Sequence, residues 1–349
     1  MKAKLKDPDG KERSKVTEFI SKQKSRQEFY PPLGKFVNLI KAEPLHNTNN
    51  AWQRWFMYLL TVVMQYTDAA KLKSVTSFLD MPDNSPVAKF LTRVKETAKC
   101  GRLYNSFVRW FGEKRKKGIS FSYRFTGVES KNFSWYFNAL IEDVLLIPNL
   151  SEGSVLKLHA LAFIGLKLRD AVSLYSRVDI SQAQVDQVKT LCQDYFKANV
   201  LFLDGVNPTV WTMGYAVPHH TQQLFQELGH GLGLNSMQGR EAKHVKLAMY
   251  TKNTCNLKKS SRWPTVFRHE YVSLIWLREM DPYNVSYKQG QGKRSESYIP
   301  KSVRENDGRF CQCGLLKFND TGCNICTSSV TNLVSQSVTN GKVILKQLL

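Results

Sequence analysis

The clearest periodic pattern in this 349-residue chain is Ala51-Trp-Gln-Arg-Trp-Phe-Met-Tyr-Leu-Leu-Thr-Val-Val63. Its large apolar side chains recur at steps of three and four residues, the spacing that places them on one face of an α-helix. The same period returns between residues 87 and 111. A turn with Pro82 and Pro86 at its ends separates the two stretches. The sequence therefore predicts a mainly α fold with a multi-helical body.

Further helices are expected toward the C-terminus. Apolar periodicity predicts helices over 154–176 and 181–203, with Ser181 as the N-cap of the second. Another helix is expected from about 238 to 251, and Trp263-Pro264 is expected to open the next one. One short strand is expected where three aromatic residues alternate with polar ones, at Phe121, Tyr123 and Phe125.

The charge balance points to a class of partner. The chain carries 50 Lys and Arg against 29 Asp and Glu, a net charge of +21 at pH 7. A basic field spread along a chain favours polyanionic partners, and nucleic acid is the usual one. A solvated basic surface and an anionic membrane are the alternatives. No secretory signal is recognisable, and the most apolar run, 55–63, falls short of the ~20 residues that span a bilayer. We expect DNA as the partner and no membrane.

Four of the seven cysteines lie close together near the C-terminus: Cys311, Cys313, Cys323 and Cys326. Paired thiolates on tight turns suit a tetrahedral zinc ion. The surrounding module is too small to fold on its own apolar content, so zinc would supply folding free energy. Four unrelated thiols are the alternative. An odd number of cysteines with one such cluster suits a reducing compartment, and we expect a structural zinc site in a nuclear protein.

Composition and pattern divide the chain into parts. Residues 1–29 hold nine Lys and Arg and few large apolar residues, and residues 282–308 are rich in Lys, Arg, Ser, Gly and Gln. We expect a basic N-terminal arm (1–30), a helical domain (31–205), a helical segment with the Glu241 motif (206–285), a linker (286–308), a zinc-binding module (309–328) and a tail (329–349).

The segment 233–246 places one carboxylate, Glu241, at the start of an expected helix among four basic or imidazole side chains: Arg240, Lys243, His244 and Lys246. Enzymes that cut and join DNA hold two divalent cations with several carboxylates, one of them often on a helix. The basic neighbours would then contact phosphates. The alternative is an ordinary acid in a helical first turn, where the helix dipole stabilises it.

Three segments in this region resemble the C-terminal part of Transib-type transposases, the group that includes the catalytic subunit of the V(D)J recombinase. They are Tyr215-Ala-Val-Pro218, Gly229-His-Gly-Leu-Gly233 and Ser236-Met-Gln-Gly-Arg-Glu-Ala-Lys243. Ala42-Glu-Pro-Leu-His46-Asn-Thr-Asn-Asn-Ala51 and Phe267-Arg-His269-Glu-Tyr271 resemble the family more weakly. The resemblance implies that Glu241 is the third catalytic acid, on a partial RNase-H-like element, and that 31–205 corresponds to the family's helical insertion.

The chain also departs from the family pattern. The first two catalytic aspartates of the family precede its insertion, and Asp7 and Asp9 lie in a polar arm that does not suit that role. The family's zinc site within the insertion has no matching cysteine pair here, and Tyr215 and Ala216 stand near the expected histidines. Asp204, after the apolar run 199–203, is an alternative second acid on a strand; a loop acid after a helix is the simpler interpretation.

These observations predict a transposase-derived DNA-binding protein, the C-terminal fragment of a metal-dependent strand-transfer enzyme. One carboxylate does not hold two cations, so we expect no strand cleavage by this chain alone, and Mg²⁺ or Mn²⁺ only where the missing acids are supplied. A general nucleic-acid-binding protein without chemistry and a zinc-stapled helical scaffold are the alternatives. A homodimer is compatible with each of them.

Overall fold

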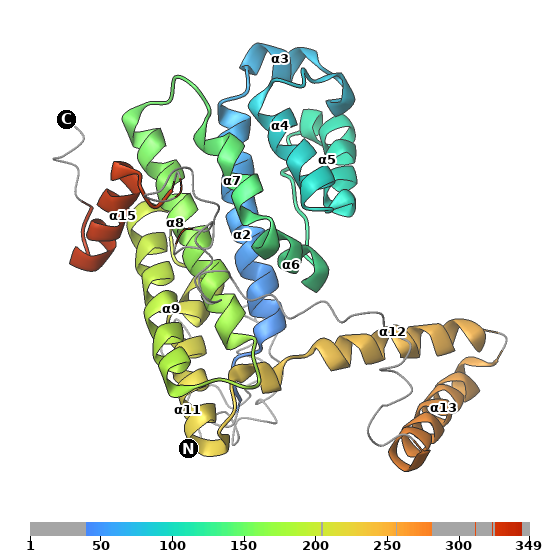
Figure 1. Cartoon of the computed structure of the whole chain (residues 1–349). Helices are drawn as coiled ribbons and strands as arrows, with labels where there is room; N and C mark the ends of the chain where they lie inside the picture. The colour runs from blue at the N-terminus through green and yellow to red at the C-terminus, as the bar shows by residue number, and fades with distance from the viewer. Residues whose placement is uncertain are drawn as a thin grey trace, which may run out of the picture. The chain divides into compact units, whose positions relative to one another are not determined.

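The computed structural model describes residues 40–203, 205–255, 257–280, 311, 323 and 325–343. Two compact units divide the chain, Met1–Lys41 and Ala42–Leu349, and nearly all described residues belong to the second. Helices make up most of the described part and no strand occurs in it, which confirms the mainly α fold (Figure 1). Among the described helices, none is both long enough and apolar enough to cross a bilayer.

The central helix α2 (Pro44–Gln65) contains the predicted periodic pattern. Glu43 caps its first turn, because the carboxylate accepts hydrogen bonds from the amides of Leu45 and His46. The apolar face is buried as predicted, and Trp52 and Trp55 pack edge to face with ring centroids 5.3 Å apart.

Five shorter helices follow α2 along the chain. They are α3 (Ala69–Ser74), α4 (Pro86–Thr92), α5 (Gly101–Glu113), α6 (Gly127–Trp135) and α7 (Phe137–Leu145), with a π-helical turn, Arg93–Thr97, after α4. Two of them, α4 and α6, pack against α2. The predicted strand at Phe121, Tyr123 and Phe125 is wrong. Phe121 and Phe125 are buried as their alternation implies, but they pack against Phe56 of α2, and the Tyr123 hydroxyl donates to buried Glu129 of α6. Helices, not a neighbouring strand, cover the segment.

The helices α8 (Glu152–Tyr175) and α9 (Gln182–Phe202) pack along each other and confirm the predicted pair. Ser181 is the predicted N-cap of α9 and forms a capping box with Gln184. The suggested strand before Asp204 is wrong, because Asn199 to Phe202 form the last turn of α9, where the Asn199 side chain donates to the Tyr195 carbonyl at 2.8 Å. Asp204 itself lies outside the described residues.

Three further elements lead from α9 to the Glu241 region: α10 (Pro208–Trp211), a π-helical turn (Thr212–Ala216) and α11 (Val217–Leu228). The glycines that follow α11 have a packing role. The amides of Gly231 and Gly233 donate to the carbonyls of Val178 and Arg177 at 2.7 and 3.0 Å. A Cβ atom on either glycine would come within 2.5 Å of backbone atoms in that loop. This close approach holds the start of the Glu241 segment against the α8–α9 connection.

The C-terminal part contains α12 (Gln238–Asn253), α13 (Lys259–Met280) and α15 (Ser329–Asn340). Helix α12 confirms the predicted helix over 238–251. Helix α13 begins four residues before the predicted start at Trp263. Proline has no backbone N–H to donate, so Pro264 removes only one hydrogen bond from the helix. The turn before Pro264 is closed by the amides of Ser261 and Arg262, which donate to the Lys258 carbonyl.

Candidate functional site

Segments far apart in the sequence meet at the start of α2. The Ala42 amide donates to Nδ1 of His220 on α11 at 2.8 Å. The Glu43 carboxylate accepts the amide hydrogen of Met237, just before α12, also at 2.8 Å. The N-terminus of α2, helix α11 and the N-terminus of α12 are therefore joined by hydrogen bonds between residues nearly 200 positions apart.

Glu43 has more hydrogen bonds than any other carboxylate of this junction. One carboxylate oxygen accepts from Leu45 and Met237, and the other accepts from the His46 amide at 2.6 Å. Burial alone would raise the pKa of Glu43, but the three backbone amides and the His46 ring outweigh it and lower the pKa below its usual 4.5. Glu43 is therefore an ionised carboxylate whose oxygens are fully engaged, and its role is structural.

His46 connects Glu43 with Glu241. Its Nδ1 lies 2.7 Å from a Glu43 oxygen, and its Nε2 lies 3.7 Å from a Glu241 oxygen. The other oxygen of Glu241 lies 3.8 Å from Nδ1 of His244. A carboxylate bound to one ring nitrogen fixes the orientation of the ring, so Glu43 directs the second nitrogen of His46 toward Glu241.

Glu241 lies in the first turn of α12, and its side chain is about half exposed at 48%. This position fits both interpretations of Glu241, the helix-dipole acid and the catalytic acid. Among the described residues, no group of three acidic, histidine or cysteine ligands gathers around it closely enough to hold a metal ion. The junction thus brings one exposed carboxylate between two imidazoles, and it does not by itself form a two-cation site.

The predicted phosphate-contacting residues divide into two pairs. Lys243 and Lys246 lie 3.4 and 3.6 Å from the carboxylate of Glu270, a buried residue of α13. Lys246 also donates to the Ser273 hydroxyl at 2.7 Å. Arg240 and His244 are exposed on α12. The two lysines therefore hold α12 to α13, while Arg240 and His244 face solvent.

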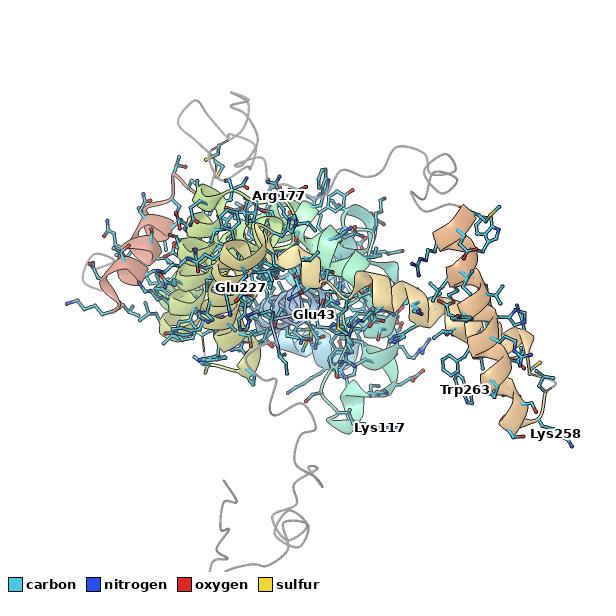
Figure 2. All side chains as sticks on the ribbon, turned by 90° about the horizontal axis from the view of Figure 1, so that it is seen from below. Glu43, Lys117, Arg177, Glu227, Lys258 and Trp263 are labelled. Atoms are coloured by element: carbon cyan, nitrogen blue, oxygen red, sulfur yellow. The ribbon has the colours of Figure 1, made fainter. Side chains whose placement is uncertain are left out.

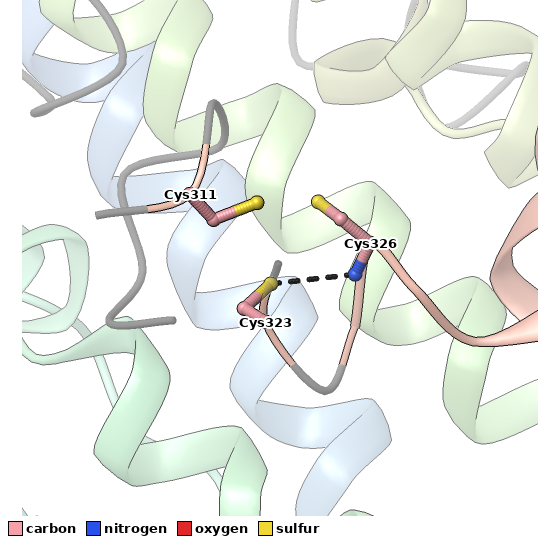
Figure 3. Close-up of side chains that lie close together, drawn as sticks. All are labelled: Cys311, Cys323 and Cys326. Carbon is pink, nitrogen blue, oxygen red and sulfur yellow. Dashed lines mark hydrogen bonds between the residues drawn. The ribbon is translucent and has the colours of Figure 1, made fainter. Parts of the chain in front are cut away.

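Three of the four predicted metal ligands come together near the C-terminus. The sulfur atoms of Cys311, Cys323 and Cys326 all lie within 4.8 Å of one another (Figure 3). The Cys326 amide donates to the Cys323 sulfur at 3.3 Å. Cys311 and Cys323 are buried, and Ile325 between the last two cysteines belongs to the hydrophobic core. The fourth predicted ligand, Cys313, lies outside the described residues.

This cluster is compatible with a metal ion. Sulfur ligands ~2.3 Å from a tetrahedral zinc lie roughly 3.8 Å apart, so a small contraction of the cluster would suffice. A short N–H···S hydrogen bond, such as the one from Cys326, stabilises thiolate charge. The three cysteines could therefore hold a metal ion such as zinc.

Sequence patterns did not identify the residues that organise the junction. Glu43 and His46 lie within the family-like segment 42–51 and Glu270 lies within 267–271, but the sequence assigns none of the three a role. The one local signal was Glu43-Pro44, an acid followed by proline at a helix start, which is a capping pattern. The partners of these residues on other helices carry no such signal.

No protein-family model, curated protein or solved structure matches this chain.

Proposed function

We propose that the chain is a transposase-derived, DNA-binding protein in which Glu241 occupies the place of the third catalytic acid. One observation carries the proposal. Three of the segments that resemble the Transib group are distant in sequence, yet they are in direct contact: 42–51 with 236–243 through Glu43 and His46, and 236–243 with 267–271 through Glu270. A shared active-site region would require this convergence, whereas unrelated short matches would not.

The proposed chemistry depends on acids that this junction does not contain. Mg²⁺ or Mn²⁺ would bind at Glu241 only with two further carboxylates in place. An RNase-H-like element also needs strands, so the proposed element within the described residues is limited to helix α12. We propose that this chain alone does not cleave DNA. Single-strand nicking of supercoiled DNA in Mn²⁺ that disappears in Glu241→Gln would overturn this.

The DNA-binding part of the proposal is supported by charge. The chain carries +21, and Arg240 and His244 flank Glu241 on the exposed side of α12. Side chains of this kind bind phosphates and give an affinity that falls with added salt, because bound cations are released from the DNA. Measurable binding of duplex DNA at ~50 mM salt is the expected result, and its absence would reject every nucleic-acid function.

We further propose that Cys313 completes the cysteine cluster as a structural zinc site, and that the protein acts in the nucleus. Four thiolates leave no open coordination position, so the zinc would stabilise the fold without a chemical role. Cys311 and Cys323 are buried within the same core as α15, which supports a structural role.

A further inference from the structure

Helix α13 exposes an unusual number of large apolar side chains. Seven of them are 45–70% exposed: Trp263, Phe267, Tyr271, Val272, Leu274, Trp276 and Met280. Helix α12 is the only described element with which α13 forms an extended contact. Side chains stand out from the α13 ribbon on more than one side, with Trp263 near its start (Figure 2). Large apolar side chains that remain exposed on several sides of one helix are unusual for a helix that faces only water.

The exposed apolar surface of α13 is a substantial part of what a specific protein contact needs. Each aromatic side chain can bury ~150–250 Å², so the seven residues together offer on the order of several hundred Å² of apolar surface. One partner contributes about 800 Å² to a standard protein interface. Isolated apolar side chains on a surface need no explanation, whereas a group of them on one helix can mark a site of interaction.

Charged side chains are sparse on the apolar part of α13. The whole helix carries four cations, Lys259, Arg262, Arg268 and Arg278, against Glu270 and Glu279, and Glu270 is buried against α12. Between residues 263 and 280 the exposed charges are Arg268, Arg278 and Glu279. An apolar face that carries both signs of charge can meet a second copy of itself with opposite charges paired.

One stripe of α13 is complementary to itself. Arg268, Val272, Ile275 and Glu279 follow one another at steps of four, three and four residues, so they share one side of the helix. If two such helices pack antiparallel around a two-fold axis, one register places Arg268 opposite Glu279 of the partner and Val272 opposite the partner's Ile275. Tyr271 and Trp276 lie on opposite flanks of this stripe, so each borders the contact along its own edge. Opposite charges thus face each other at both ends of an apolar centre.

We propose that α13 is a self-association surface, and that two copies of this chain form a dimer in which their α13 helices pack antiparallel. An interface of this kind uses the same patch on both subunits, so each contact occurs twice. The dimer does not depend on DNA binding or on the identity of Glu241.

The test measures the mass of the full chain in solution, without DNA and in reducing buffer because Cys255 is exposed. Sedimentation equilibrium over about 1–50 μM protein should give twice the 40.0 kDa of one chain. Trp276→Glu should give the single-chain mass. Trp211→Glu is the matched control, because Trp211 is similarly exposed on α10, and it should remain dimeric. A single-chain mass for the native protein, or a dimer that survives Trp276→Glu, would overturn the proposal.

A charge exchange tests the antiparallel register. Arg268→Glu and Glu279→Arg each create two like-charge contacts, so each should raise the dissociation constant about tenfold or more. The double variant exchanges the two charges and should return the dissociation constant close to the native value. Both positions are exposed, and an unchanged far-UV circular dichroism spectrum verifies folding. A double variant as weak as the single ones would contradict the register.

Discussion

The Glu43 carboxylate accepts a hydrogen bond from the Met237 amide across 194 positions of sequence, with 2.8 Å between oxygen and nitrogen. The same carboxylate caps α2 and binds the ring of His46. One side chain therefore fixes the start of α2, the entry into α12 and the position of His46 beside Glu241. The geometry of the candidate site depends on Glu43 although Glu43 has no place in the chemistry.

Replacement of Glu43 should destabilise the protein. Glu43→Ala removes an N-cap, worth ~1 kcal/mol, and leaves the Met237 amide unpaired, which costs about 1–3 kcal/mol. Glu43→Gln keeps a neutral acceptor and should cost clearly less. Urea unfolding followed by circular dichroism measures both free energies of unfolding. Equal stability of Glu43→Ala and the native protein would show that the junction does not form in solution.

Stability should fall in acid because two partly buried carboxylates have lowered pKa values. Burial would raise the pKa of Glu129, but hydrogen bonds from Tyr123, Thr126 and Arg102 lower it below 4.5. The pKa of Glu43 is likewise lowered, because its hydrogen bonds outweigh its burial. A lowered folded-state pKa contributes stability above the unfolded value, and that stability is lost as the pH falls through the folded value.

The contribution of these two carboxylates to the free energy of unfolding should therefore change little between pH 7 and about 5, and it should decline below pH 5. The double variant Glu43→Gln/Glu129→Gln has no titratable group at either position. Its free energy of unfolding should therefore decline less steeply in acid. If the variant followed the native pH profile, the two carboxylates would not be the groups responsible.

The contact between α12 and α13 should depend on the charge of Glu270. Lys243 and Lys246 are its ion-pair partners, and one Glu270 oxygen has no hydrogen bond. Removing both lysines leaves a buried carboxylate without compensation, which costs several kcal/mol. Lys243→Ala alone should cost about 1 kcal/mol or less, because that lysine is nearly half exposed and screened by water.

Glu270→Gln in the double-lysine background provides the control. It removes the uncompensated charge and should recover part of the lost stability, measured again by urea unfolding. No recovery would mean that the lysines stabilise the helix pair by packing alone.

The cysteine cluster should bind one equivalent of metal. Native protein purified with zinc should contain one zinc per chain, and Cys323→Ser should lose it and unfold at lower temperature, because zinc binding contributes to folding. Atomic emission gives the metal content. Cys255→Ser is the matched control, because Cys255 is an exposed thiol on the α12–α13 connection. Zinc retained by Cys323→Ser would exclude the site.

The sequence predicted those structural elements that depend on residues only a few positions apart. The α2 face and the Ser181–Gln184 capping box depend on spacing within a few residues, and both were predicted. The alternation of aromatic and polar residues correctly predicted that Phe121 and Phe125 are buried. Alternation does not reveal whether a strand or helices pack against the buried side chains. The Glu43–Met237 bond joins two helix ends through tertiary packing, and no spacing rule connects such positions.

DNA binding through the exposed start of α12 can be measured as the affinity for duplex DNA by fluorescence anisotropy between ~50 and 200 mM salt. The logarithm of the affinity should fall linearly with the logarithm of salt concentration. Arg240→Ala should weaken binding and reduce the slope by about 1. Lys117 is also an exposed cation, in the turn after α5, and Lys117→Ala should change neither the affinity nor the slope. No binding at ~50 mM salt, or identical slopes for the native protein and Arg240→Ala, would contradict the claim.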